Sequence, residues 1–419
     1  MRAGFNYAVR YWAEVTCVSP LRTGGVEQDL EQVLRRWDGT PYLQGSSLAG
    51  ALRDWRNDEE LFGSREREGQ LIVSDLEFSP DAAQGTRPRL HIDGTTGTGA
   101  DGGKFDVSAL LPGTTGSFTL VWQGKEPPEP ILPVLESYLA ALDAGHIRLG
   151  GQRSNGFGRV SLSVRRRRYD MRNPEDLTSW LEDAPANEAV ALDRSGLQDG
   201  AVTFQVTARL HRLLVKAAAP AGVGQGSIDA PPMEENCRLL LPGSSIKGAV
   251  RAHISRIAPF CLGGDSGLRW ENFLGRGCEP GRDNGIAGKA WFSDGAFEDT
   301  AAAAISRIRI NRITGGVLNK ALFTEQPVTA TVKWSITAPE AERAGCALLL
   351  YALRDLGLGL YTLGSGGSIG HGLADWVRVE IHVPGQKTAV LDSRPEAVRL
   401  EDPEGVVSGW LDACKEVRT

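Results

Sequence analysis

The chain has 419 residues, long enough for two or three domains, and its 41% hydrophobic and 23% charged residues are typical of globular proteins. This composition excludes a disordered or fibrous chain, and the longest uninterrupted apolar run, 346–353, is far shorter than the ~18 residues that cross a membrane. The formal charge of −6 is concentrated in the acidic segment 170–199, and the six cysteines form no CxxC pair. We therefore expect a cytoplasmic protein with reduced thiols and no membrane partner.

The first half of the chain predicts a run of strands and helices that ends near residue 165. The opening strand, over 5–17, shows partial alternation of apolar and polar residues. A helix then begins at Gly45-Ser46-Ser47, where a serine can cap it. The other expected elements are short strands over 71–78, an insertion, a strand over 117–123, a helix over 130–142 and a last strand over 158–164.

The second half predicts the same order of elements. They are a strand over 202–214, a helix from Gly243, short strands over 290–297, an insertion, a strand over 330–337, a helix over 340–356 and a strand over 372–381. This βαββαβ order predicts an α+β fold of two tandem ferredoxin-like domains. Helices should cover one face of each sheet and leave the other face for a ligand.

Three motifs occur twice, in the same order. They pair Gly45–Arg53 with Gly243–Arg251, Leu90-His91-Ile92-Asp93 with Ile308-Arg309-Ile310-Asn311, and the glycine-rich loop 149–158 with the loop 363–372. Repeated motifs in one order indicate duplicated domains. We therefore predict a first domain at 1–169, an acidic linker at 170–199, a second domain at 200–384 and a C-terminal extension at 385–419.

The Gly-Ser-Ser helix starts are candidate phosphate sites. Unpaired amides and hydroxyls lie there beside the positive end of the helix dipole, although a tight turn with an N-cap is the structural alternative. Arg53 and Arg251 follow one to two turns later, and Lys247 adds a charge where the first copy has Ala49.

The glycine loops are a second candidate. Their glycine density lets the backbone approach a phosphate chain closely, and Arg153 could add a charge; a bulged helix-to-strand connection is the alternative. Neither loop has the Gly-Lys-Ser/Thr of a Walker motif or follows the first strand, which argues against a nucleotide cofactor.

Two further clusters have both a structural and a functional interpretation. The four arginines at 165–168 could contact phosphate or form a solvated strand edge. Cys237, Cys261 and Cys278 with His253 could form a zinc knuckle, but no pair of them has zinc-finger spacing.

Together, the segments 242–251 and 308–315 and the glycine loops resemble the RAMP superfamily, and more closely the backbone subunit of type III CRISPR effector complexes. The resemblance covers about 1–165 and 200–380, as two fused copies. It implies RRM-like palms with inserted thumbs that stack along a CRISPR RNA and displace bases of the guide–target duplex. The implied partners are CRISPR RNA, target RNA and other effector subunits. The implied RNA-binding residues are Gly45, Ser46, Ser47, Arg53, Arg153, Gly243, Ser244, Ser245, Lys247, Arg251, Arg309 and Arg312.

The resemblance also implies a catalytic aspartate in the loop after the first strand of each domain. Asp229, within Gly226-Ser227-Ile228-Asp229-Ala230-Pro231, matches the family pattern. Asp29 is its counterpart in the first domain only with a two-residue slip, and Asp38 competes with it. Gln44 and Ala49 replace the family's proline and lysine, and Gly94 stands where Arg312 stands in the second copy.

Such an aspartate could hold a divalent cation, which we expect to be Mg²⁺, or orient the RNA 2′-hydroxyl for attack on its own phosphate. The leading hypothesis is thus a double backbone subunit that cuts target RNA at two sites. One alternative is a non-catalytic structural RNA-binding subunit. Another is a metal-independent endoribonuclease that matures CRISPR RNA. His91 and His371 could suggest such acid–base cleavage, but neither has a second histidine nearby, and core or surface histidines are the structural alternative.

Overall fold

The computed structural model of the chain describes residues 4–418 except 25, 28–29, 32, 94–95, 198–199, 217–227, 263–266, 278–284 and 320. The chain divides into two compact units, Met1–Arg153 with Phe157–Asp199, and Ser154–Gly156 with Gly200–Thr419. Each unit combines an antiparallel sheet with helices, so the predicted α+β class is confirmed. Among the described residues, no helix is both long and apolar enough to cross a membrane.

The first unit is built around a central strand, β1 (Tyr7–Cys17). It pairs antiparallel with both β9 and β10, and the sheet order is β11-β10-β1-β9-β6-β4, with β5 also paired to β9. The partner strands are β4 (Tyr42–Leu43), β5 (Leu71–Val73), β6 (Leu76–Phe78), β9 (Thr115–Gly124), β10 (Val160–Asp170) and β11 (Glu188–Val190). Two helices lie between β1 and β5 along the chain and one connects β9 to β10, and the order of the main helices and strands is the ferredoxin-like arrangement.

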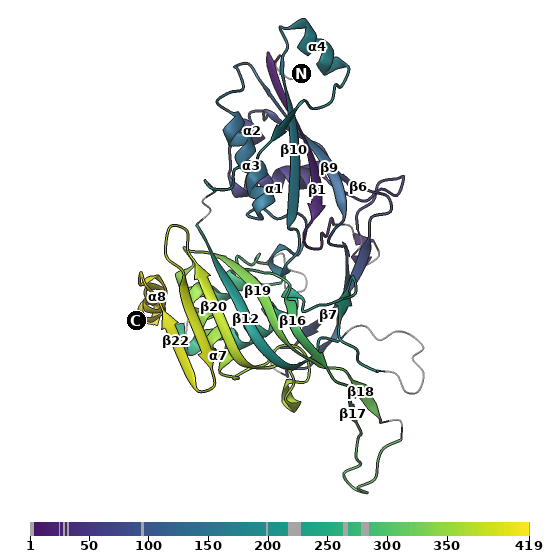
Figure 1. Cartoon of the computed structure of the whole chain (residues 1–419), viewed down its shortest axis with the longest axis vertical. Coiled ribbons are helices and arrows are strands. Elements are labelled where there is room, and N and C mark those ends of the chain that lie inside the picture. The colour runs from purple at the N-terminus through teal and green to yellow at the C-terminus, as the bar shows by residue number, and fades with distance from the viewer. Residues whose placement is uncertain are drawn as a thin grey trace. The chain divides into compact units, whose positions relative to one another are not determined.

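Helices α1 (Gly45–Trp55), α2 (Glu59–Phe62) and α3 (Leu132–Ala144) lie on one face of this sheet (Figure 1). Alternate residues of β1, from Val9 to Cys17, point to that face and are buried, whereas Glu14 and Thr16 between them are exposed. Leu48 and Leu52 of α1 and Leu139 of α3 complete the core. The strand alternation of period two and the helical spacing together explain why the chain folds this way.

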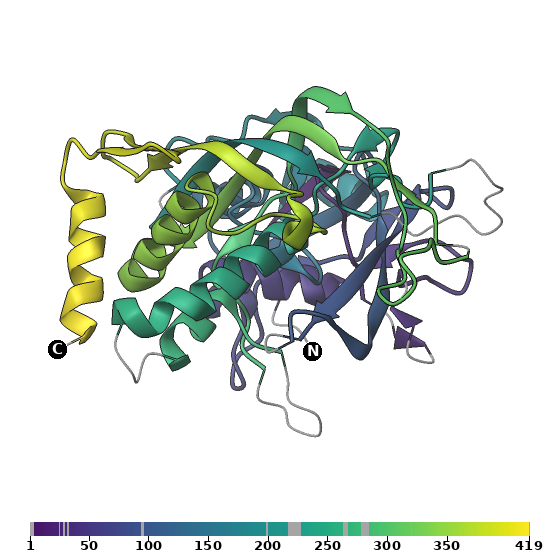
Figure 2. The same cartoon turned by 90° about the horizontal axis from the view of Figure 1, so that it is seen from below.

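The second unit repeats this plan around β12 (Ala201–Leu213). Its sheet order is β15-β19-β12-β20-β21-β22, with β16 also paired to β19. The partner strands are β15 (Trp291–Phe292), β16 (Ala296–Ala302), β19 (Val328–Pro339), β20 (Leu373–His382), β21 (Ala389–Arg394) and β22 (Ala397–Glu401). The helices are α5 (Gly243–Leu262), α6 (Gly267–Leu274), α7 (Arg343–Gly357) and α8 (Val406–Arg418); Figure 2 shows α5 and α7 side by side against one face of the sheet.

Two segments outside the repeats carry regular structure. Residues 170–199, expected to be a linker, contain α4 (Pro174–Leu181) and β11, which extends the first sheet. Trp180 of α4 makes edge-on ring contacts with Phe5 at 5.9 Å and Tyr169 at 5.1 Å. In the expected C-terminal extension, β21 and β22 continue the second sheet and Trp410 of α8 is buried in its core.

Each unit has an insertion between equivalent strands of its sheet. In the first unit, β7 (Gln84–Ile92) and β8 (Gly99–Leu110) form a hairpin that joins β2 (Val26–Glu27) and β3 (Leu30–Glu31) in a separate sheet. In the second unit, β17 (Ile305–Arg307) and β18 (Phe323–Glu325) form the corresponding hairpin. We call these the first and second insertion hairpins.

The remaining elements are short. A hairpin of β13 (Glu234–Glu235) and β14 (Arg238–Leu239) precedes α5. Short 3-10 helices lie in the glycine loops at Arg153–Asn155 and Gly367–Ile369.

Candidate nucleic-acid interface

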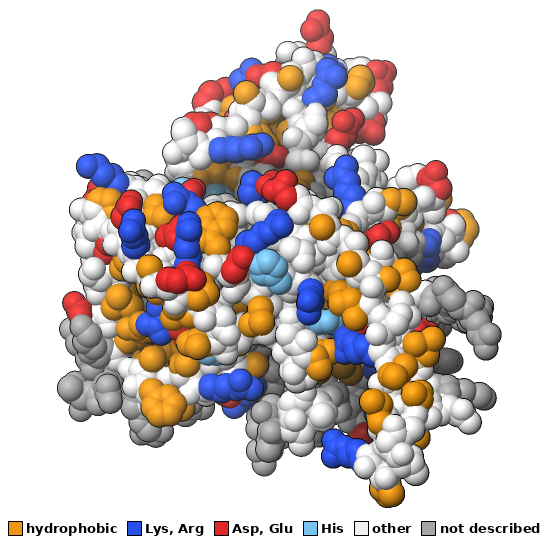
Figure 3. Space-filling model, turned by 60° about the horizontal axis from the view of Figure 1, so that its bottom comes forward, with side chains coloured by type: hydrophobic (Ala, Val, Ile, Leu, Met, Phe, Trp, Pro, Cys, Tyr) orange, Lys and Arg blue, Asp and Glu red, His pale blue; other side chains and the backbone are white. Residues whose placement is uncertain are grey.

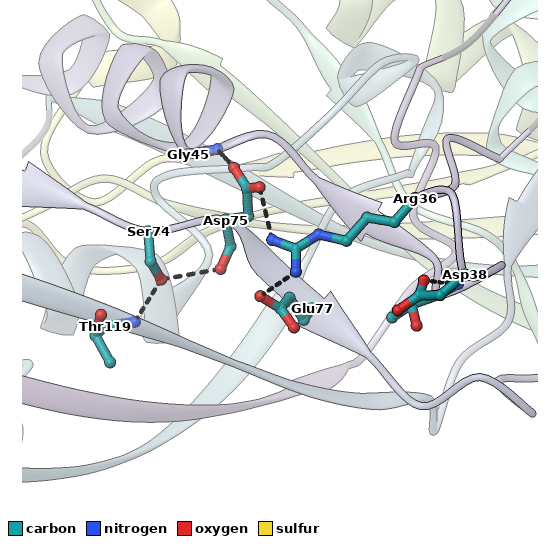
Figure 4. A network of polar contacts seen from close by, with 8 residues as sticks. Arg36, Asp38, Gly45, Ser74, Asp75, Glu77 and Thr119 are labelled. Atoms are coloured by element: carbon teal, nitrogen blue, oxygen red, sulfur yellow. Dashed lines mark hydrogen bonds and ion pairs between the residues drawn. The ribbon is translucent and has the colours of Figure 1, made fainter.

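The start of helix α1 is held by an aspartate from the turn between β5 and β6 (Figure 4). The Gly45 amide donates to Asp75 Oδ1 at 2.8 Å, and Arg36 donates to Asp75 Oδ2 at 2.9 Å. Ser74 Oγ donates to the Asp75 carbonyl and accepts from the Thr119 amide, which ties this turn to β9. The Gly45 amide and then Arg36 lower the pKa of Asp75, so a carboxylate lies at the positive end of the helix dipole.

The second domain has the same arrangement at α5. The Gly243 amide donates to Asp294 Oδ1 at 2.7 Å, while Ser293 Oγ donates to the Asp294 carbonyl and accepts from Ser335 N. The glycine is required because a Cβ at Gly243 would lie 2.5 Å from the Phe292 carbonyl oxygen. A Cβ at Gly45 would likewise lie 2.5 Å from the carbonyl oxygen of Val73.

The chain's own carboxylates therefore bind the amides of Gly45 and Gly243, which favours the structural alternative at these two positions, and their contact with RNA stays a prediction. Ser46 and Ser47 are exposed and Ser244 and Ser245 are half-buried, and their contact with RNA stays a prediction. The Ser-Asp pairs were missed from sequence. They form a fourth repeated motif, since Ser74-Asp75 and Ser293-Asp294 are each followed by a phenylalanine at the same distance, Phe78 and Phe297.

The arginine of the second helix start is also held by its own domain. Arg251 is half-buried, its guanidinium lies 5.2 Å from the centre of the Trp270 ring, and it donates to the Gly275 carbonyl. Burial lowers the pKa of Arg251. This side chain joins α5 to α6, so it has a packing role within the domain, and its contact with phosphate stays a prediction.

The other predicted cations near these motifs are half-buried. Arg53 donates to Asn57 Oδ1 at 2.8 Å, and Arg153 lies 3.5 Å from Asp54 Oδ2. Lys247 lies one turn into α5. Surface pairs of this kind are weak, so these three positions remain candidates for RNA contact.

The glycine loops have a backbone explanation. Gly158 and Gly372 have φ angles of +84° and +70°, and a Cβ at either would collide with the carbonyl oxygen of Leu149 or Leu363. The same two leucines donate their amides to Gly158 O and Gly372 O at 2.9 and 3.0 Å. Both loops are therefore tight connections from helix to strand, and this geometry favours the bulged-connection alternative.

Each loop places a ring beside an arginine at the base of the insertion hairpin. In the first domain the Arg89 guanidinium lies 5.4 Å from the centre of the Phe157 ring. In the second domain Arg307 lies 3.4 Å from His371 Nε2, although there the buried Glu325 also pairs with Arg307 and with Lys216. Burial and the nearby cations lower the pKa of His371.

The repeated motif at 90–97 and 308–315 forms a turn within each insertion hairpin. Asp93 Oδ1 accepts from Thr96 N, and Asn311 Oδ1 accepts from Ile313 N. In the second hairpin the side chains around this turn are exposed, including Arg309 and Arg312. Apolar side chains gather there too (Figure 3), namely Ile308, Ile310, Ile313, Val317, Leu318, Leu322 and Phe323. Exposed apolar groups beside two arginines form a surface suited to a binding partner.

The three candidate catalytic aspartates have different surroundings. Asp229 is exposed and attached to the second insertion hairpin, since its Oδ2 accepts from Thr324 N at 2.7 Å and its amide donates to Thr324 O. Asp29 lies outside the described residues, as does Gly94. Asp38 caps its own turn by accepting from Thr40 N at 2.9 Å, and this bond lowers its pKa. That local role argues against Asp38 as the catalytic alternative.

The arginine run at 165–168 pairs with the acidic segment. Arg166 binds Glu188 at 2.6 Å and also Glu136, and Arg168 lies 3.7 Å from Glu188. Arg167 donates to Ser179 Oγ at 2.9 Å. These contacts favour the structural interpretation of the run, in which the three arginines hold α4 and β11 onto β10.

The histidine among the zinc candidates already has buried partners. His253 is buried, binds Asp355 Oδ2 at 2.8 Å and stacks on Tyr361 at 4.4 Å. Within the described ranges no group of three or more His, Cys, Asp or Glu residues could hold a metal ion; Cys237 and Cys261 fall inside these ranges and Cys278 outside them. His91 is exposed, whereas His371 is buried beside Arg307.

Comparison with known families gives one clear match. The family model of the RAMP superfamily matches residues 14–161 and 238–375. The two regions fall in the two halves of the chain, as expected of two fused copies. No curated protein shows significant similarity to the sequence.

Proposed function

Because the chain belongs to the RAMP superfamily, whose members are RNA-binding components of CRISPR complexes, we propose that it is a double backbone subunit of a type III RNA-guided effector complex. The observation that carries this proposal is the duplication. Each of the two family matches falls in a domain that has a ferredoxin-like sheet and an insertion hairpin at the same place. Two palms and two thumbs in one chain suit a protein that binds two successive segments of a guide RNA.

The insertion hairpins are the proposed thumbs. Arg309 and Arg312 would contact phosphate, and the exposed apolar side chains around them would lie against bases of the guide–target duplex. Contacts to phosphate neutralise charge, so RNA binding should weaken as salt is raised. Lys247, Arg53 and Arg153 would add contacts along the palm.

We further propose that target RNA is cut beside Asp229, and beside Asp29 in the first domain. The RNA 2′-oxygen attacks the adjacent phosphorus while Asp229 orients the 2′-hydroxyl and accepts its proton. The bond to the 5′-oxygen breaks, and that oxygen takes a proton from water and leaves as a hydroxyl, so a 2′,3′-cyclic phosphate remains. As a lone exposed carboxylate, Asp229 fits Mg²⁺ only as one ligand, so water and RNA phosphate must supply the others. A bound Mg²⁺ would stabilise charge on the phosphate oxygens.

One observation favours a non-catalytic RNA-binding subunit as the second candidate. Asp229 Oδ2 is already bound to the Thr324 amide, so the side chain also has a structural role at the base of the thumb. The buried position of His371 argues against the RNA-maturing endonuclease.

The substitution Asp229→Asn separates catalysis from structure, because asparagine keeps an oxygen for the Thr324 amide but loses the charge. In complexes assembled with guide RNA and given end-labelled target RNA and Mg²⁺, we expect Asp229→Asn to lower one cut by about 100-fold or more and leave its neighbour. Target binding should be unchanged.

Asp38→Asn is the matched control and should leave both cuts. Equal cutting by wild type and Asp229→Asn, or cutting that persists in chelator, would contradict the catalytic part of the proposal and leave the non-catalytic subunit. A protein that binds neither guide nor target RNA would contradict both.

A further inference from the structure

An exposed tryptophan lies at the tip of a short hairpin that precedes α1. The Trp37 side chain is 98% exposed. The two arms of the hairpin meet through Tyr42 N and Leu34 O at 3.1 Å, and Arg36 N donates to Thr40 O at 2.9 Å. No other large apolar side chain among the described residues 33–43 is exposed.

The tip is held rigidly in spite of its exposure. Asp38 accepts from Thr40 N, the Gly39 amide donates to Arg36 O at 3.0 Å, and Arg35 donates to Gly39 O. Arg36 in turn is bound to Asp75 at 2.9 Å and to Glu77 of β6 at 2.8 Å (Figure 4). Hydrogen bonds and ion pairs therefore stabilise a turn that presents an indole ring to solvent.

We infer that Trp37 is a stacking platform for an unpaired nucleobase of RNA, an inference that rests on the proposed RNA-binding function. A protein partner would need a contiguous apolar patch, and this hairpin offers a single ring. A nucleobase needs only one flat ring and gains from a nearby cation, which the exposed Arg35 supplies. Stacking is insensitive to sequence because every base has a π-face.

The second domain provides a natural comparison. Its hairpin β13–β14 also precedes a Gly-Ser-Ser helix, but its tip is Glu235-Asn236-Cys237-Arg238 and carries no aromatic ring. Asn236 and Cys237 form the turn with φ angles of +51° and +58°, and Cys237 is exposed. The base-stacking function is therefore assigned to the first domain, and Cys237→Ala is the matched control.

The test measures binding of the full-length protein to fluorescein-labelled single-stranded oligouridine and to the same strand carrying abasic sites. We expect Trp37→Ala to weaken binding of the intact strand by roughly 5- to 150-fold, the range for loss of one stacked base. The abasic strand should bind wild type and Trp37→Ala equally. Trp37→Phe should retain most of the affinity, Trp37→Leu should behave like Trp37→Ala, and Cys237→Ala should change nothing.

The dependence of affinity on salt separates stacking from phosphate contact. Its slope should be the same in wild type and Trp37→Ala, because the indole neutralises no phosphate. Unchanged binding of the intact strand by Trp37→Ala, or an equal loss on both strands, would overturn the inference. So would a Trp37→Ala protein that binds RNA normally but no longer binds another protein subunit. If wild type binds neither strand, the proposed function itself fails, whereas binding that is unaffected by Trp37→Ala removes this inference alone.

Discussion

One position shows how the two domains differ in chemistry on the same backbone. Phe157 and His371 occupy equivalent places in the glycine loops, each beside an arginine of the insertion hairpin. Phenylalanine does not titrate, whereas burial, Arg307, Arg212 and Lys216 all disfavour a proton on His371. Glu325 pairs with two of these cations, so it only partly offsets their effect.

We predict that His371 makes the second domain sensitive to acid. Its folded-state pKa lies below the ordinary 6.5, so the unfolded chain binds more protons as pH falls. The stabilising contribution is present above about pH 6.5 and decreases at lower pH. His371→Phe, which copies the first domain, should reduce this dependence, as measured by hydrogen exchange of peptides from 363–382 at about pH 7 and pH 5. His91→Phe, at an exposed site, is the control; an unchanged pH dependence in His371→Phe would count against this account.

At the scale of elements, β11 and α4 turn the acidic segment into part of the first domain. Strand β11 is paired with β10 and is joined to it by the bidentate contact of Arg166 with Glu188. This contact lowers the pKa of Glu188, so the pair is ionised at neutral pH. The arginine run is thus neutralised within the domain.

We predict that Glu188→Gln makes Arg168 available to RNA, and Arg166 only in part because Glu136 still binds it. Hydrogen exchange in β11 should become faster, RNA affinity should rise, and the slope of log affinity against log salt should steepen by about 1 for each arginine that engages a phosphate. Glu396→Gln, which removes the same charge from the exposed turn between β21 and β22, should have no such effect. Equal salt slopes in the two variants would show that the arginines do not reach RNA.

The repeated elements could be predicted from sequence, because β1 and β12 alternate with period two and the helices begin at a repeated motif. The contacts that determine which groups of the candidate site are available to RNA could not be predicted from sequence. Asp75 and Asp294 bind the helix starts from turns 30 and 51 residues further along the chain, and Glu188 binds Arg166 from outside the repeat. Such partners depend on strand pairing between distant residues, so a local pattern of glycine, serine or arginine overstates how many groups are available to phosphate.

At the scale of the whole molecule, each domain has its own hydrophobic core. The second core includes residues of β12, β19, β20, α5, α7 and α8, so it extends from Val202 to Cys414. Strand β12 is central to that sheet, which makes it indispensable to the domain.

We predict that a fragment of residues 200–419 folds alone, with cooperative thermal unfolding and a circular dichroism spectrum of mixed helix and strand. A fragment that begins at 215 lacks β12 and should not unfold cooperatively. Failure of the longer fragment to fold, or cooperative unfolding of the shorter one, would contradict the assignment of an independent core.

The covalent fusion of two domains also controls stoichiometry. Because one message and one translation event produce both copies, they are always made in equal amounts, whatever the level of expression. Any assembly built from this chain alone must contain an even number of such domains and can grow only in steps of two. The length of the assembly, and with it the length of any polymer it covers, would therefore be counted in pairs.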